Sequence, residues 1–419
     1  MAVFTRIFVA ALLFSCAPVS ADDRETEIKK AEASFASKDY ARAKEAFERA
    51  LSVDRPADSA TQAHILSRLG ATCVELKDDV GAISMYRKAL KVADDDWPER
   101  LHVAWRLALV HQKRGHIDAS IAVLTEELTR SGQMPGSEPW VIARRLLGVL
   151  LATKRDWRGA ESVLEDTLSK MPDESRLRCS VMATLAEVLM VRGQYVRAED
   201  LLYGYFQMKA RPEDAARQLH LMVVLAELYL RMGYLPDGET LARKAVNALN
   251  EIPESVRGPE ALYAWSMLAR TLLRAGRVDE AAEAVRRATL VNAEGFEARL
   301  AFAEVEYKRE HFDKAYEIAT GLAAQEEGDT SLWVGDVLFV GARALDKSGR
   351  ADEAKAWYVR ATAAYEKLDP EHPELVGVLR GHADLLQREG DASGAARLRE
   401  RAARVEKVYV DTLPADRRK

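Results

Sequence analysis

Apolar residues along this chain recur at three- and four-residue intervals, in runs of helical length separated by turn residues. The stretch from Leu262 to Leu290 shows the pattern most plainly, because two such runs flank the helix breaker Gly276. Ala269 and Ala281 stand where the two helices must approach most closely, since a larger side chain there would hold the backbones apart. The stretch therefore predicts a helical hairpin with two closely packed positions, which we call the tight slots.

The pair of tight slots, twelve residues apart, recurs ten times along the chain. Every slot holds Ala, Gly or Ser, and successive units are separated by 34 to 43 residues. The first slots are Ala31, Gly70, Ala108, Gly148, Ala186, Ala226, Ala269, Ala303, Ala342 and Ala383. The second slots are Ala43, Ala82, Ser120, Ala160, Ala198, Gly238, Ala281, Ala315, Ala354 and Ala395. Repetition of this kind predicts a solenoid, in which each hairpin buries its apolar face against its neighbours.

The residues around the slots resemble the tetratricopeptide repeat. A leucine precedes the first slot in six units, and the turn and second helix that run from Asp39 through Ala43 to Phe47 and Ala50 have the spacing of that family. The resemblance implies an all-α, right-handed superhelical solenoid of about ten helical hairpins over residues 22–410. It also implies a scaffold or adaptor that binds protein or peptide segments in a concave groove, rather than an enzyme.

Residues 1–21 have the features of a secretory signal peptide. Arg6 precedes an apolar stretch, and small residues end at Ala21. They predict a periplasmic or secreted protein after cleavage near Ala21, and proteins of this appearance serve in the bacterial cell envelope. Leu13 to Cys16 also resembles a lipoprotein cleavage box, so lipidation at Cys16 and an outer-membrane assembly or secretion role remain open. Residues 411–419 are predicted to form a disordered tail.

Charge and cysteine content narrow the classes of partner. The formal net charge of −5 lacks the basic footprint that nucleic-acid binding requires. Cys73 and Cys179 lie in units three apart, too far to form a disulfide. The sequence gives no indication of the oligomeric state.

Catalytic and metal-binding motifs are missing from the sequence. There is no HExxH motif, no glycine-rich phosphate loop, no nucleophile elbow and no paired-cysteine metal spacing. His64 and His102 occupy equivalent places on successive first helices, but a metal ion needs more ligands than this pair supplies. We therefore expect no enzyme activity, cofactor or metal, while a ligand-binding or enzymatic site formed across repeats remains the alternative.

The wall of the groove is set by residues near the first slots. Trp105, Leu109 and Val149 are apolar at places that a solenoid exposes, and Arg145 lies beside them. With His64 and His102, these residues are the predicted partner-binding set: an apolar pocket with a cationic rim. The alternative is that the long units bury these side chains internally. Later units carry charges at the equivalent places, which we expect to pair with one another, with binding of a polar partner as the alternative: Glu187, Glu227, Arg270, Glu304 and Arg343.

Overall fold

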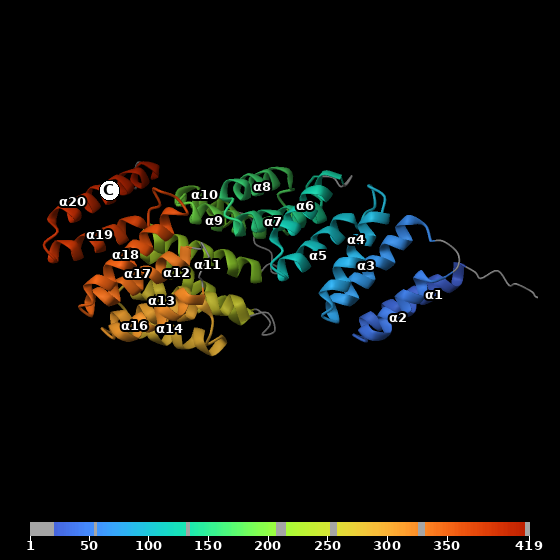
Figure 1. Cartoon of the computed structure of the whole chain (residues 1–419), viewed down its shortest axis with the longest axis horizontal. Helices are drawn as coiled ribbons and strands as arrows, with labels where there is room; N and C mark the ends of the chain where they lie inside the picture. The colour runs from blue at the N-terminus through green and yellow to red at the C-terminus, as the bar shows by residue number, and fades with distance from the viewer. Residues whose placement is uncertain are drawn as a thin grey trace, which may run out of the picture. The chain divides into compact units, whose positions relative to one another are not determined.

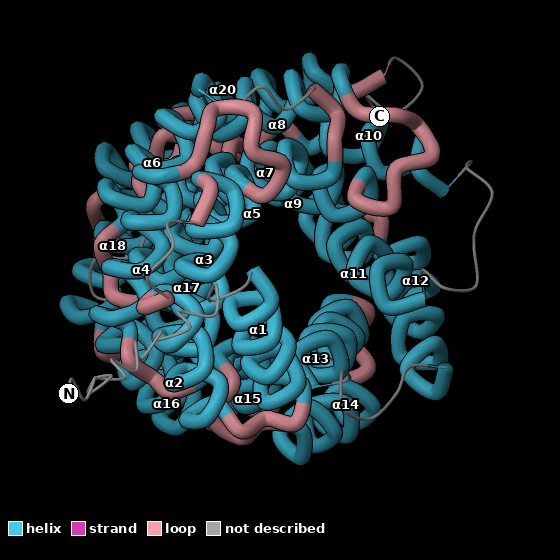
Figure 2. Tube along the Cα trace, turned by 90° about the vertical axis from the view of Figure 1, so that its right-hand side faces the viewer, coloured by secondary structure: helices cyan, strands magenta, loops and turns pink. Residues whose placement is uncertain are grey.

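The computed structural model describes residues 21–53, 57–130, 135–206, 215–251, 258–325 and 332–414. These residues form twenty α-helices and one short 3-10 turn, with no strand among them (Figures 1 and 2). The predicted all-α solenoid class is therefore confirmed. In chain order the helices are α1 (Ala21–Ala36), α2 (Tyr40–Leu51), α3 (Ser59–Glu75), α4 (Asp79–Val92), α5 (Arg100–Lys113), α6 (Ile117–Arg130), α7 (Glu138–Thr153), α8 (Trp157–Lys170), α9 (Arg178–Val191), α10 (Tyr195–Phe206), α11 (Ala215–Met232), α12 (Leu235–Ala248), η2 (Leu249–Glu251), α13 (Gly258–Arg274), α14 (Val278–Val291), α15 (Phe296–Lys308), α16 (Phe312–Gln325), α17 (Leu332–Lys347), α18 (Ala351–Glu366), α19 (Leu375–Arg388) and α20 (Ala392–Thr412).

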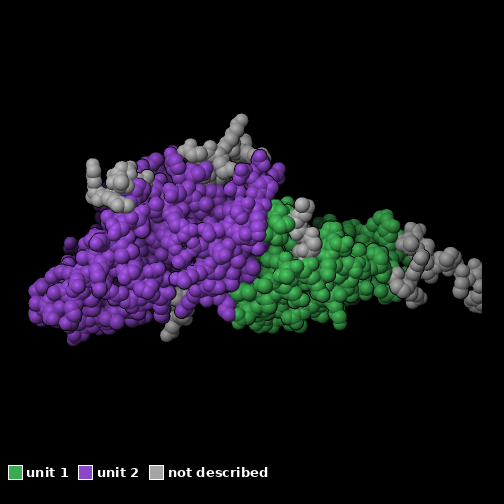
Figure 3. Space-filling view, turned by 90° about the horizontal axis from the view of Figure 1, so that it is seen from above, with its two compact units in different colours: residues 1–143 green, residues 144–419 purple. Residues whose placement is uncertain are grey.

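The helices follow one another as packed hairpins within two compact units, residues 1–143 and 144–419 (Figure 3). We call these unit 1 and unit 2; α7 contributes to both. The densest contacts join the two helices of one hairpin, as in α3 with α4 and α17 with α18. First helices of neighbouring hairpins also touch, so that α13 packs on both α11 and α15. The core is thus a row of helix interfaces, as expected for stacked repeats.

All twenty tight slots are buried. Two of them show directly that the slots of one hairpin touch. Ser120 Oγ donates a hydrogen bond of 2.8 Å to the carbonyl oxygen of Ala108, its partner slot. A Cβ atom added to Gly238 would lie 3.3 Å from the carbonyl oxygen of Ala226. In these two hairpins a small side chain is required because the second slot packs against the backbone of the first slot.

Two first slots hold glycine for an identifiable reason. A Cβ atom on Gly70 would lie 2.6 Å from the ring of Tyr86, and one on Gly148 would lie 2.7 Å from Leu164. Both partners stand four residues after the second slot of the same hairpin. Tyr86 and Leu164 occupy the space that the methyl group of an alanine at the first slot would need, so only glycine fits there.

Each of the ten hairpin turns contains one residue with positive φ. Six of these residues are glycines, but Lys38, Lys77, Arg155 and Glu310 adopt φ values of 61° to 65°. The next residue closes the turn by donating its N–H to a carbonyl five residues earlier, as Asp78 does to Cys73 at 2.8 Å. This is the Schellman arrangement that ends a helix. Asp39, Asp78, Asp156 and Asp391 then cap the second helix with their side chains.

The ends of the chain lie largely outside the described residues. This applies to residues 1–20 of the predicted signal peptide, to Cys16 and to residues 415–419. α20 continues to Thr412, two residues beyond the predicted boundary at residue 410. Among the described helices, none is both long and apolar enough to span a membrane. Cys73 and Cys179 are both buried and unbridged.

Candidate functional site

Unit 1 contains a cavity of about 370 Å³ between its first helices and the second helix α4. Side chains from α1, α3, α4 and α5 line it. They are Phe35, Arg68, Ala71, Val74, Glu75, Asp79, Tyr86, Trp105, Arg106, Leu109, Val110 and Lys113. We call this the unit 1 cavity. Its volume suits one or two large side chains of a bound segment.

Trp105 and Leu109, two of the predicted partner-binding residues, both line the unit 1 cavity. They lie one turn apart on α5, on either side of the tight slot Ala108. Leu109 is 40 % exposed, and the buried Nε1 atom of Trp105 has no hydrogen-bond partner in the described chain. The cavity therefore keeps apolar surface in contact with solvent, which is costly unless a ligand covers it.

The charged rim of the cavity is mostly neutralised by its own neighbours. Arg68 donates two hydrogen bonds to Glu32, at 2.6 and 2.5 Å, and its guanidinium lies 4.3 Å from the Phe35 ring centre. Lys113 Nζ lies 2.9 Å from Asp79 Oδ1. The guanidinium of Arg106 lies 5.6 Å from the Trp105 ring centre. The rim thus presents paired charges around an apolar floor.

The remaining predicted residues lie elsewhere. His64 Nδ1 lies 3.1 Å from Glu99 Oε1 and its Nε2 lies 3.9 Å from Glu32 Oε1, so both ring nitrogens face carboxylates. The hydrogen bond to Glu99 raises the pKa of His64. Burial lowers the pKa of His102.

Arg145 and Val149 lie on the part of α7 that belongs to unit 2. Burial lowers the pKa of Arg145, and the opposing influence is the charge of Glu187. The unit 1 cavity is therefore lined by two of the predicted residues and by Phe35, Arg68 and Arg106, which the sequence interpretation did not select. The missed cations lie on first helices within one turn of the slots, where the helical period places them on the same wall.

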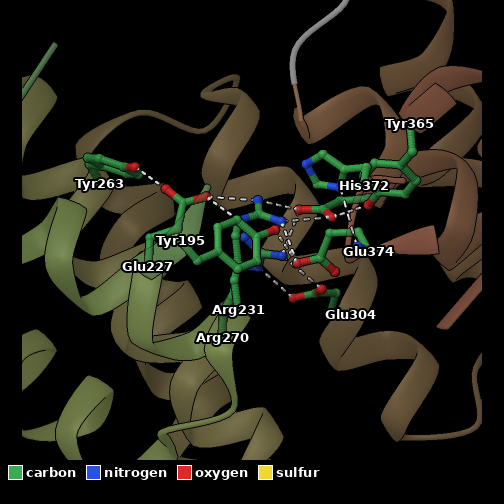
Figure 4. A network of polar contacts seen from close by, with 10 residues as sticks. Tyr195, Glu227, Arg231, Tyr263, Arg270, Glu304, Tyr365, His372 and Glu374 are labelled. Carbon is green, nitrogen blue, oxygen red and sulfur yellow. Dashed lines mark hydrogen bonds and ion pairs between the residues drawn. The ribbon is translucent and has the colours of Figure 1, made fainter. Parts of the chain in front are cut away.

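The centre of unit 2 holds a buried network of charged and phenolic side chains (Figure 4). Asp336 accepts hydrogen bonds from Arg231 and Arg270, both at 3.0 Å, and from the Tyr365 hydroxyl at 2.5 Å. Arg270 also reaches Glu304 at 3.1 Å. The side chains of Arg231 and Arg270 are each only 4 % exposed. The expected pairing of charges between repeats is therefore present for Arg270 and Glu304.

The network joins repeats that are distant in sequence. Arg231 bonds Glu227 one turn away at 2.8 Å, but it also bonds Asp336 across 105 residues. Tyr263 donates its hydroxyl to Glu227. Burial alone would raise the pKa of Asp336, but the two guanidinium groups outweigh burial and hold it well below its ordinary value. Asp336 is thus an ionised, dry carboxylate that links α11, α13 and α18 to α17.

A second cavity, of about 310 Å³, lies beside this network in unit 2. All of its lining residues come from first helices: Glu187, Met190 and Val191 from α9, Glu227 from α11, Tyr263 from α13, Glu297 from α15, and Leu332 and Trp333 from α17. Three carboxylates and no basic side chain line it, so it favours a cationic group over an anionic one. The described residues contain no group of three or more His, Cys, Asp or Glu side chains placed to hold a metal ion.

Comparison with known proteins agrees with this architecture. Models of the tetratricopeptide repeat match residues 28–56, 223–295 and 266–331. A tetratricopeptide repeat protein from Parabacteroides merdae is similar in structure, with a TM-score of 0.50 and 10 % identity over 68 % of this chain and 99 % of that chain. The Rap protein solved in complex with Competence and Sporulation Factor has a TM-score of 0.55 and 13 % identity, over 84 % of this chain and 100 % of that chain. No curated protein sequence matches the chain.

Proposed function

The chain is a tetratricopeptide repeat protein, and from this premise we propose that it serves as a non-catalytic scaffold that binds segments of partner proteins. A solenoid has a large surface for its mass and presents it on rigid helices, which suits recognition of extended or helical segments. The proposal rests on one observation above the others: the unit 1 cavity, with Trp105 and Leu109 in its wall.

We propose that the unit 1 cavity receives a large apolar side chain of a partner segment. The floor is aromatic and aliphatic, while most rim charges already have partners within the chain. An arriving apolar group would cover the exposed part of Leu109 without leaving rim charges unpaired. A buried apolar anchor surrounded by satisfied polar groups is the usual composition of an interaction hot spot.

The test begins with capture of a partner from extract of the source cells, using the chain without residues 1–21 as bait. The identified partner is then titrated against the Trp105→Ala and Leu109→Asp variants. Loss of a hot-spot contact should weaken binding by about 2 kcal/mol, or roughly 30-fold. The matched control is Leu76→Asp, because Leu76 is similarly exposed, at 41 %, but does not line the cavity. Equal affinity for folded Leu109→Asp and wild-type protein would end this assignment.

We further propose that the protein acts in the bacterial cell envelope, on the basis of the signal-like residues 1–21. The competing proposal is a lipoprotein anchored through Cys16. Mass spectrometry of the mature protein separates them, because cleavage after Ala21 leaves an unmodified Asp22 as the first residue. A lipid-modified Cys16 at the N-terminus would support the anchored form and overturn the soluble one.

A further inference from the structure

The loop between α18 and α19, residues 367–374, packs against helices of unit 2 that lie much earlier in the sequence. We call it the closing loop. The Tyr195 hydroxyl at the start of α10 donates to Glu374 Oε1 at 3.0 Å, across 179 residues. Arg231 Nη1, near the end of α11, lies 3.4 Å from the same oxygen. The closing loop is therefore held to two earlier helices through one carboxylate.

The turn between α9 and α10 is shaped to receive the closing loop. Gly193 has a φ of 69°, and a Cβ atom added to it would lie 2.5 Å from Cδ of Pro373. Other turn glycines with positive φ, such as Gly276, have open space at that place. Gly193 thus meets two requirements, a left-handed turn and close approach of another segment.

His372 lies at the centre of this contact and is fully buried. Its ring stacks on Tyr365 at 5.4 Å between centres and meets the edge of Tyr195 at 6.1 Å. The Glu374 backbone N–H donates to His372 Nδ1 at 3.3 Å. Because Nδ1 accepts, the hydrogen-bond geometry assigns the neutral ring with its proton on Nε2.

This geometry disfavours a second proton on the His372 ring. Both ring nitrogens of an imidazolium are donors, so Nδ1–H would oppose the N–H of Glu374. The new positive charge would also be buried near the guanidinium of Arg231, which already disfavours it. Above about pH 4, His372 therefore takes up a proton readily only when the closing loop moves its ring into water.

Groups from every neighbouring element act on His372. They are the Met190 carbonyl of α9, Tyr195 of α10, Arg231 of α11, Asp336 of α17, Tyr365 of α18, Asp369 and Glu374 of the closing loop, and Tyr409 of α20, which meets Tyr195. Burial lowers the pKa of His372 to about 4, with Arg231 acting in the same direction; the Met190 carbonyl and the charges of Asp369 and Asp336 only partly oppose them.

We propose that the closing loop is an acid-opened latch, in which proton uptake by His372 releases residues 367–374 from α9, α10 and α11. Opening exposes Tyr195 and Arg231, which are buried when the latch is closed. This inference concerns unit 2 and is independent of the unit 1 cavity.

The direction of the pH effect follows from where the proton binds. Above pH 6.5, the ordinary pKa of histidine, both forms are neutral and the latch is closed. Between 6.5 and about 4 the released form binds a proton that the closed form does not, so acid favours release. From pH 7.5 to pH 5 the ratio of closed to released loop should fall about 30-fold. Asp336 titrates below this window because its pKa is held below 3.8.

Hydrogen exchange of the full chain at pH 7.5 and 5.0, corrected for the intrinsic pH dependence of exchange, tests the latch. The wild-type amides of Gln194, Glu374 and Leu375 should lose about 30-fold in protection at pH 5.0. His372→Asn keeps an acceptor near Nδ1 but cannot become charged, so its protection should not change with pH. His382→Asn is the control, because His382 is a half-buried histidine of α19 that stacks on Tyr358; it should behave as wild type.

Two results would overturn the proposal. One is wild-type protection that is equal at both pH values, which needs no variant to fold. The other is a folded His372→Asn protein that loses protection at pH 5.0 as wild type does, because release would then depend on another group.

Discussion

The stability of unit 2 should depend strongly on the single carboxylate of Asp336. Replacing it by Asn removes the negative charge that faces Arg231 and Arg270, each at 3.0 Å, and presents an amide N–H₂ where both neighbours are donors. The substitution preserves side-chain shape, so the effect is electrostatic rather than a matter of cavity volume.

The expected loss follows from burial. Removing one partner of a buried charge pair costs about 3–5 kcal/mol, because the remaining charge is dry and uncompensated. Glu374 still pairs with Arg231, and Glu304 still pairs with Arg270. The expected loss in the free energy of unfolding is therefore about 3 kcal/mol, the lower end of this range. Urea unfolding followed by circular dichroism and tryptophan fluorescence measures it.

Asp384→Asn provides the matched control. Asp384 bonds Arg399 at 2.9 Å, a similar distance, but its side chain is 61 % exposed. An exposed ion pair contributes less than about 1 kcal/mol. Equal losses for Asp336→Asn and Asp384→Asn, or a loss under about 1 kcal/mol for both, would refute the claim that the network stabilises unit 2.

Gly193→Ala should lower the free energy of unfolding by about 1–3 kcal/mol more than Gly276→Ala does, because only Gly193 also packs against the closing loop. The urea midpoints of the two variants measure this difference. Lys77→Gly should raise stability by about 1 kcal/mol, since it relieves a positive φ of 61° in an exposed turn, and a lower urea midpoint would contradict this. Glu99→Gln should lower the pKa of His64 in an NMR titration, because their hydrogen bond raises it. The stabilisation from that bond is complete below pH 6.5 and disappears as pH rises through the pKa of the folded protein.

The repeat architecture follows from the sequence because its requirement is local. A slot that packs against an opposite backbone admits only Ala, Gly or Ser, so size alone marks its position. Each of the twenty predicted slots is buried. Trp105 and Leu109 are found by the same logic, since their offsets from Ala108 fix the wall they face.

The positive-φ residues of the hairpin turns could be predicted from the sequence only where they are glycine. Gly193 and Gly276 mark turns because glycine adopts positive φ without strain. Lys38, Arg155 and Glu310 adopt the same conformation without any sequence signal, because the turn is held by backbone hydrogen bonds.

The buried network could not be predicted. Arg231 and Asp336 are separated by 105 residues, and Tyr195 and Glu374 by 179. Their meeting depends on how far each hairpin rotates relative to the last, a quantity that accumulates over several repeats and that no short motif encodes. Glu227 and Arg270 are recognisable from the sequence as charged positions of the wall, but their partners Arg231 and Asp336 are not.

The central claim is that close packing at the tight slots holds this chain in its fold. Urea unfolding of Ala354→Leu and Ala356→Leu tests it most directly, because the same substitution is made twice on α18, once at a buried slot and once at an exposed position two residues away. We predict that Ala354→Leu lowers the free energy of unfolding by about 1–3 kcal/mol, the cost of overpacking a filled interface, and that Ala356→Leu changes it by less than about 0.5 kcal/mol. Equal stability of the two variants would contradict the account.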